Sequence, residues 1–203
     1  MAILTDSNDT GACRPPPADA IAATRHWLEA AVIGLNLCPF AKAVHVRQQV
    51  RFVVSDARDA AELRRDLAAE LRRLRDTPAQ EVDTTLLIHP WVLQDFLEYN
   101  DFLDEADAVV EEHDLAGIIQ VASFHPDYQF ADAGPDDITN YTNRSPYPIL
   151  HLLREDSIDR AVEAFPDAEE IYGRNMATMA RLGLKGWHAL GVKPAADKER
   201  GED

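Results

Sequence analysis

The sequence predicts an α/β fold, in which a small, mostly parallel sheet of three to four strands is flanked by helices in a single domain. Three short runs rich in apolar and β-branched residues, at Val50–Val54, Thr84–Ile88 and 118–124, have the length of strands. The two segments between these runs carry apolar residues at helical spacing. Strands that are joined through helices of this length pair in parallel, by right-handed crossovers.

The domain is expected to occupy residues 18–186 of the 203-residue chain. Residues 1–17 end in three consecutive prolines and show no periodicity, so we expect a disordered leader. Residues 187–203 are expected to form a flexible tail. A chain of this length is typical of one domain, and a hydrophobic fraction of 46% is ample for its core.

Two helices are predicted on either side of the first strand. Residues 19–35 repeat apolar side chains at helical spacing and stop at the turn that begins with Gly34. Residues 58–75 follow Ser55 and Asp56, either of which can cap the helix by accepting backbone hydrogen bonds. This second helix places four leucines on one face: Leu63, Leu67, Leu71 and Leu74.

A third helix is predicted to end at Gly117, directly before the third strand. Its apolar positions are Phe96, Tyr99, Leu103, Ala106 and Val110. Further along the chain, residues 149–165 and 168–182 are predicted to be helical. Residues 149–153 are apolar enough to form a short fourth strand instead.

The chain is strongly acidic, with 36 aspartates and glutamates against 20 lysines and arginines and a net charge of −16. Such a field repels phosphate backbones and anionic membranes, so we expect neither nucleic acid nor a membrane as a partner. No apolar stretch has the length of a membrane-spanning helix, and the amino terminus lacks the pattern of a secretory signal. We therefore expect a soluble, cytoplasmic protein.

Two histidines follow predicted strands directly, and each precedes a proline: His89 and His125. The carboxyl ends of parallel strands are where open α/β sheets hold their ligands. Both imidazoles are candidates for general acid and base, because an imidazole titrates near neutral pH. They are also candidate metal ligands, with Asp127, His151 or Cys38 as a third. The structural alternative is that each ring is buried and bonded to a backbone carbonyl.

The loop after His125, residues 126–148, has no regular period but is rich in polar and aromatic residues. Arg144 is the candidate for binding an anion, because a guanidinium can form two parallel hydrogen bonds with a carboxylate or phosphate. Its structural alternative is a salt bridge to Asp127, Asp136 or Asp137 that only holds the loop. The other candidate substrate-binding residues of this loop are Asn143, Asp127, Tyr128 and Asn140.

Cys38 is a candidate nucleophile, because it follows a helix and precedes Pro39 in a turn, where a nearby histidine can lower its pKa. The alternative is a buried, unreactive side chain, since unpaired cysteine usually behaves as a small hydrophobic residue. With two cysteines in the whole chain, a disulfide framework is not expected.

The chain has neither the glycine-rich phosphate-binding motifs of nucleotide enzymes nor a Gly-x-Ser-x-Gly nucleophile turn. These absences leave three hypotheses for its function. The first is a small-molecule enzyme with a polar site at the strand ends, where His125 acts as acid or base and Arg144 binds an anionic substrate. The others are a binding or interaction module without catalysis and a metal-binding protein with histidine ligands. Cofactor and oligomeric state are left unspecified.

Three segments, at residues 34–41, 122–130 and 143–148, resemble a bacterial family known as the DUF1415 domain. The resemblance covers about residues 24–182. It implies a single-domain architecture and supplies no catalytic assignment. The three segments contain Cys38, His125 and Arg144, which are the same positions that the residue chemistry indicates.

Overall fold

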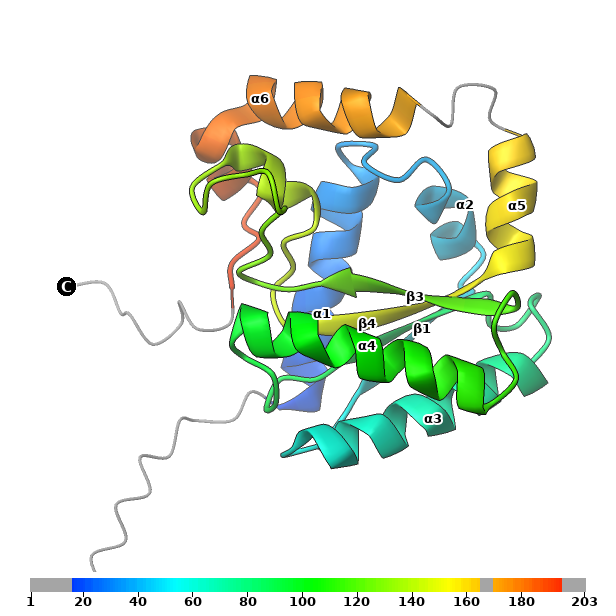
Figure 1. The fold of residues 1–203 in the computed structure, drawn as a ribbon. Coiled ribbons are helices and arrows are strands. Elements are labelled where there is room, and N and C mark those ends of the chain that lie inside the picture. The colour runs from blue at the N-terminus through cyan, green and yellow to red at the C-terminus, as the bar shows by residue number, and fades with distance from the viewer. Residues whose placement is uncertain (1–15, 165–169, 195–203) are drawn as a thin grey trace, which may run out of the picture.

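A computed structural model describes residues 16–164 and 170–194. Within these ranges, one four-stranded sheet lies between two layers of helices (Figure 1). The strands are β1 (Val50–Val54), β2 (Thr84–Ile88), β3 (Ile119–Phe124) and β4 (Ile149–Arg154). The helices are α1 (Pro17–Trp27), η1 (Leu28–Ile33), α2 (Ala41–Val46), α3 (Ala60–Asp76), α4 (Phe96–Glu112), η2 (Ile138–Thr142), α5 (Glu155–Glu163) and α6 (Ile171–Ala189).

The sheet is mixed, which corrects the prediction of a mostly parallel one. Its strand order is β1-β2-β4-β3, with β1 parallel to β2 and β4 antiparallel to both of its neighbours. The fourth strand includes residues 149–153, for which the sequence allowed either a helix or a strand. The loop between β3 and β4 contains no crossover helix that could carry the chain back to the end of the sheet at which β3 begins. Strand β4 therefore runs antiparallel beside β3.

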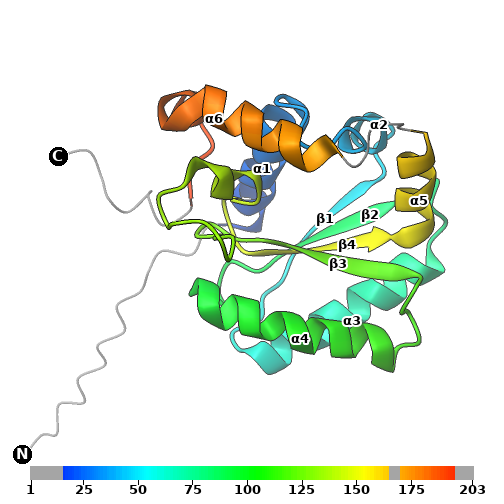
Figure 2. The same cartoon turned by 45° about the horizontal axis from the view of Figure 1, so that its top comes forward.

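The two faces of the sheet bury separate apolar clusters, because side chains alternate between the faces of each strand. Helices α3 and α4 cover one face, and α1, η1, α2, α5 and α6 lie on the other (Figure 2). On β4, Leu150 and Leu152 pack toward α3 and α4, whereas Ile149 packs on the opposite side. The leucines predicted to face the core on α3 are all buried.

The first helical segment differs in detail from its prediction. The α-helix begins at Pro17, and its continuation η1 is a π-helix, which then ends at Gly34. A Cβ atom at Gly34 would lie 2.3 Å from the carbonyl oxygen of Ala30, so the close turn after η1 requires glycine. Helix α3 is capped by Asp59, whose side chain accepts from the backbone N–H of Glu62, and not by Ser55 or Asp56.

The carboxyl-terminal helix α6 reaches Ala189, beyond the domain end predicted at residue 186. Its Trp187 is buried, and the indole contacts the ring of Tyr141 edge-on at 5.1 Å between ring centroids. Residues 1–15 of the predicted leader and 195–203 of the predicted tail lie outside the described residues. In the ranges that the structure covers, no helix combines the length and apolar character needed to cross a bilayer.

Tyr99 of α4 fastens this helix to the end of the sheet. Its hydroxyl donates to the carbonyl oxygen of Ile149 at 2.8 Å and accepts from the backbone N–H of Phe124 at 3.1 Å. Phe124 and Ile149 are the last paired residues of β3 and β4 at that end. The side chain is fully buried, and burial raises the pKa of its hydroxyl far above the usual value.

Replacing Tyr99 by phenylalanine is expected to lower the free energy of unfolding by about 1–3 kcal/mol, because it removes one donor and one acceptor from a buried strand end. Urea unfolding followed by circular dichroism measures this change. Tyr172→Phe is the matched control, because Tyr172 is 64% exposed and its loss should change stability by less than about 0.5 kcal/mol. Equal effects of the two substitutions would contradict the role of the Tyr99 hydroxyl.

Candidate functional site

His89 and His125 lie where the sequence predicts, directly after β2 and β3. The two rings flank the ring of Tyr99, with centroid distances of 5.7 Å for His89 and 5.0 Å for His125. Both histidines are fully buried. The structure therefore brings the two predicted imidazoles together, around a tyrosine that belongs to the core.

One ring nitrogen of each histidine contacts the backbone of the turn before α4. Nδ1 of His89 lies 3.0 Å from the carbonyl oxygen of Val92, to which it donates. Nδ1 of His125 accepts from the backbone N–H of Asp127 at 3.0 Å, so Nε2 carries the proton and donates to the Leu93 carbonyl at 3.2 Å. Leu93 has a φ of 55°, a left-handed conformation that these contacts help to hold.

Burial keeps both imidazoles neutral. Desolvation lowers the pKa of His89 to about 4, and it also lowers the pKa of His125. Nε2 of His89 is buried without a hydrogen-bond partner among the residues described. These surroundings match the structural alternative for the two histidines, while their catalytic role remains an untested prediction.

The predicted anion-binding residue, Arg144, contacts its own loop. Its Nε donates to the carbonyl oxygen of Tyr128 at 3.2 Å, and a terminal nitrogen donates to that of Pro135 at 2.8 Å. The guanidinium also lies over the ring of Tyr141, 4.4 Å from its centroid. None of the ion pairs found among the described residues includes Arg144, so the alternative of a bridge to an aspartate is not what holds it.

Two of the remaining loop candidates, Asn140 and Asn143, also bind backbone groups. Asn140 is fully buried, accepts from the N–H of Phe130 and donates to the carbonyl of Gly134. Asn143 donates weakly to the carbonyl of Ser123 at 3.4 Å. Tyr128 is half-buried and Asp127 is exposed. These contacts order the loop beside the two histidines and engage most of the donors that a ligand would need.

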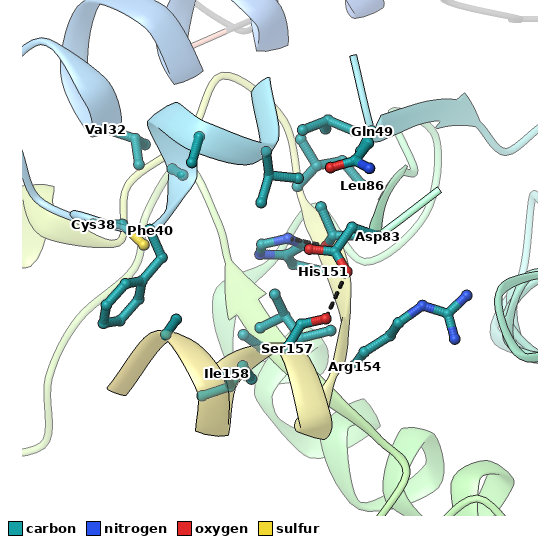
Figure 3. A pocket seen from close by; sticks show the side chains of 18 of the residues that line it. Val32, Cys38, Phe40, Gln49, Asp83, Leu86, His151, Arg154, Ser157 and Ile158 are labelled. Carbon is teal, nitrogen blue, oxygen red and sulfur yellow. Dashed lines mark hydrogen bonds between the residues drawn. The ribbon is translucent and has the colours of Figure 1, made fainter. Parts of the chain in front are cut away.

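A large cavity lies elsewhere, on the face of the sheet that is covered by η1, α2 and α5 (Figure 3). We call it the sheet cavity; its volume is about 860 Å³. It reaches Val50, Thr84 and Gln120, which stand at or next to the amino ends of β1, β2 and β3. Most of its lining is apolar and includes Trp27, Leu28, Val32, Phe40, Leu86, Ala122, Phe124, Leu153, Ile158 and Ala161.

This position follows from the mixed topology of the sheet. The rule that ligands bind at the carboxyl ends of strands applies where neighbouring parallel strands diverge and leave a crevice. Here the amino end of β4 lies between the carboxyl ends of β2 and β3, and Tyr99 fills that end. Cys38 lines the sheet cavity, whereas His89, His125 and Arg144 do not.

His151 of β4 is the polar side chain at the floor of the sheet cavity. The hydroxyl of Thr84 donates to the carbonyl oxygen of Leu152 at 2.7 Å, so its oxygen accepts from Nε2–H of His151, which is 2.6 Å away. This fixes the tautomer and leaves the lone pair of Nδ1 as an acceptor. Desolvation lowers the pKa of His151 to about 4, so the ring is neutral near pH 7.

Cys38 lies in the turn between η1 and α2, with Phe40 beside it at one side of the cavity (Figure 3). Its side chain is half-buried. Desolvation raises the pKa of the thiol, and the backbone N–H groups of Phe40 and Ala41 offset this only in part. The thiol therefore stays protonated near neutral pH, which does not favour a nucleophile.

The sequence indicated His151 only as a third metal ligand and gave no role to Thr84. The signal that could have identified His151 is the alternation of side chains, with a period of two, along residues 149–153. If this segment is a strand, Ile149, His151 and Leu153 share one face, and an imidazole is then placed in the middle of an apolar surface.

A metal centre built from the histidines finds no counterpart in residues 16–164 and 170–194. No group of three or more histidine, cysteine, aspartate or glutamate side chains is placed there to hold an ion. The third ligands that the sequence suggested are also dispersed, because His151 and Cys38 line the sheet cavity while Asp127 is on the loop after His125.

The fold and the site together define a three-layer α/β protein with an apolar cavity on one face of a mixed sheet. The chain belongs to the family described as "Protein of unknown function (DUF1415)", whose model matches residues 19–189. This match confirms the resemblance seen in the sequence and covers most of the chain. No curated protein and no solved structure matches the chain.

Acidification is expected to destabilise the protein between about pH 6.5 and pH 4. His89 and His151 have a pKa of about 4 when folded, below the value of 6.5 for an unperturbed imidazole, so over this range the unfolded chain binds more protons. The free energy of unfolding should therefore fall with pH, by up to about 1.4 kcal/mol per pH unit for each histidine. Urea unfolding at a series of pH values measures the slope.

The variant His151→Leu tests whether this slope arises from the cavity histidine. It removes one titrating group, while the Thr84 hydroxyl keeps its acceptor at Leu152. The variant should lose stability less steeply than the wild type as the pH falls. Parallel slopes for the two proteins would show that His151 is not held neutral by the fold.

Proposed function

We propose that this protein binds a largely apolar small molecule in the sheet cavity. The observation that carries the proposal is the cavity itself, whose volume of about 860 Å³ falls in the range of small-molecule sites. The cavity is partly open to solvent, and a bound molecule would remove its apolar lining from water, which favours binding. The π-helical η1 supplies Leu28 and Val32 to its wall, and π-helical turns are frequent at functional sites.

The two reactive side chains of the cavity support binding more than catalysis. A general base is most effective when its pKa is near the working pH, and the pKa of His151 is about 4. A nucleophilic cysteine needs a lowered pKa, and burial raises that of Cys38. Neither group is tuned for acid–base or thiol chemistry at neutral pH.

His151 adds one polar requirement to an otherwise apolar ligand. Its Nδ1 accepts a hydrogen bond, because Nε2–H is committed to Thr84. A hydroxyl or amide N–H of the ligand, or a bound water, would satisfy this nitrogen. The imidazole therefore fixes the orientation of the ligand, while the apolar walls provide most of the binding energy.

The hypothesis of an enzyme with its site at the strand ends remains a prediction. His125 has both ring nitrogens bonded to backbone atoms, and Arg144 donates to two carbonyl oxygens. A ligand at that site would have to replace these contacts, each of which stabilises the loop. The sheet cavity needs no such exchange.

Filling the cavity is expected to abolish binding of an apolar probe. N-phenyl-1-naphthylamine, a neutral dye that fluoresces in apolar surroundings, should bind the wild-type protein. Ala122→Phe on the sheet and Ala161→Phe on α5 each place a ring into the cavity from a different wall, because both alanines line it. Each variant should bind the dye at least about tenfold more weakly, as expected for the loss of more than about 1.4 kcal/mol.

The matched control is Ala69→Phe, because Ala69 is exposed on α3, in the opposite layer of the molecule. This variant should bind the dye like the wild type. Circular dichroism establishes that each variant is folded before the titrations are compared. Wild-type affinity in both cavity variants, or failure of the wild type to bind any dye, would overturn the proposed function.

A further inference from the structure

We propose that the ligand of the sheet cavity is an amphipathic anion, with an apolar tail beside η1 and a carboxylate bound by Arg47 and Arg160. This inference rests on the proposed function and deepens it by naming the class of ligand. It arises from an uneven distribution of polar groups in the cavity and from the charges at its rim.

The sheet cavity has an apolar side and a polar side. In Figure 3, Val32, Cys38 and Phe40 lie to one side of His151, whereas Gln49 and Asp83 lie to the other. Trp27 and Leu28 also line the cavity and are almost fully buried. A ligand that matches this division has an apolar part and a polar end.

Arg47, at the end of α2, is held by a buried side chain of the cavity wall. Its Nε donates to Oε1 of Gln49 at 2.7 Å, and Nε2 of Gln49 donates to the carbonyl oxygen of Gln80 at 2.8 Å. Gln49 is only 9% exposed. This chain of hydrogen bonds orients the guanidinium through Nε and leaves both terminal nitrogens to bind a carboxylate in a bidentate manner.

Arg160 of α5 also lines the sheet cavity. A terminal nitrogen donates to the Ser157 hydroxyl at 2.9 Å, and that hydroxyl donates to Oδ1 of Asp83 at 2.6 Å. The carboxylate of Asp83 therefore already accepts a hydrogen bond from within the protein. The guanidinium of Arg160 keeps further N–H groups for a ligand.

The charged groups that line the cavity favour an anion. They are three arginines and one aspartate, in a chain whose net charge is −16. Arg154 is occupied, because it donates to the carbonyl oxygens of Leu74, Thr77 and Val82. Neither Arg47 nor Arg160 takes part in an ion pair within the described parts of the chain. The acidic residues that flank Arg160 on α5, Asp156, Asp159 and Glu163, do not line the cavity.

The test compares three probes that share one apolar chain and differ in their polar end: decanoate, decanol and decylammonium. Each displaces N-phenyl-1-naphthylamine from the protein at a concentration below that at which it forms micelles. Decanoate should bind about tenfold more tightly than decanol, as expected for charge-assisted hydrogen bonds to arginine. Decylammonium should bind most weakly, and added salt should narrow the differences.

The variants Arg47→Gln and Arg47→Gln/Arg160→Gln identify the groups that bind the carboxylate. The first should weaken decanoate binding about tenfold and the second further, with decanol binding unchanged in both. Arg181→Gln is the control for the single change in net charge, because Arg181 is exposed on α6 and does not line the cavity. It should bind all three probes like the wild type.

The possible results separate this inference from the proposed function. Dye binding with equal affinities for decanoate and decanol, or decanoate affinity that survives the double substitution, overturns the anionic ligand and leaves the cavity as a binding site. The tightest binding by decylammonium overturns it as well, because Asp83 would then dominate the rim. Absence of dye binding in the wild-type protein overturns both.

Discussion

The place of β4 between β2 and β3 determines the rest of this structure. Because β4 is antiparallel to both neighbours, its first residues lie at the end of the sheet where the other three strands have their carboxyl ends, and they close this end. The same arrangement puts His151 opposite Leu86 and Ala122, in the middle of the face that lies under η1 and α5. One strand thus closes the expected ligand site and forms the floor of the sheet cavity.

The histidines at the end of the sheet and the histidine on its face make different contacts. At the carboxyl ends of β2 and β3, His89 and His125 bind two consecutive carbonyl groups, those of Val92 and Leu93. These hydrogen bonds hold the turn that leads into α4. On the other face, His151 has Nε2 bonded to Thr84 and lines the sheet cavity. All three rings are neutral, and of the three only His151 lines the sheet cavity.

The sequence predicted the first three strands and helix α3 to within about two residues, because their periodicity is strong and local, whereas α4 ends at Glu112 and not at Gly117 as predicted. It could not give the direction of β4, since a loop of more than twenty residues permits either pairing. The strand-end histidines were found, but a buried imidazole and a reactive one look alike in a sequence. The cavity was missed because its wall includes α2, a six-residue helix with no buried side chain and no clear period.

Helix α5 follows β4 without a single intervening residue, and Arg154 at their junction is tied to the end of α3 and to the segment before β2. None of the α5 side chains is buried, and the hydroxyl of Ser157 on this helix donates to Asp83, in the segment before β2. The position of α5 beside the sheet cavity therefore depends on hydrogen bonds at the start of the helix, from Arg154 and Ser157, and not on buried side chains of the helix itself.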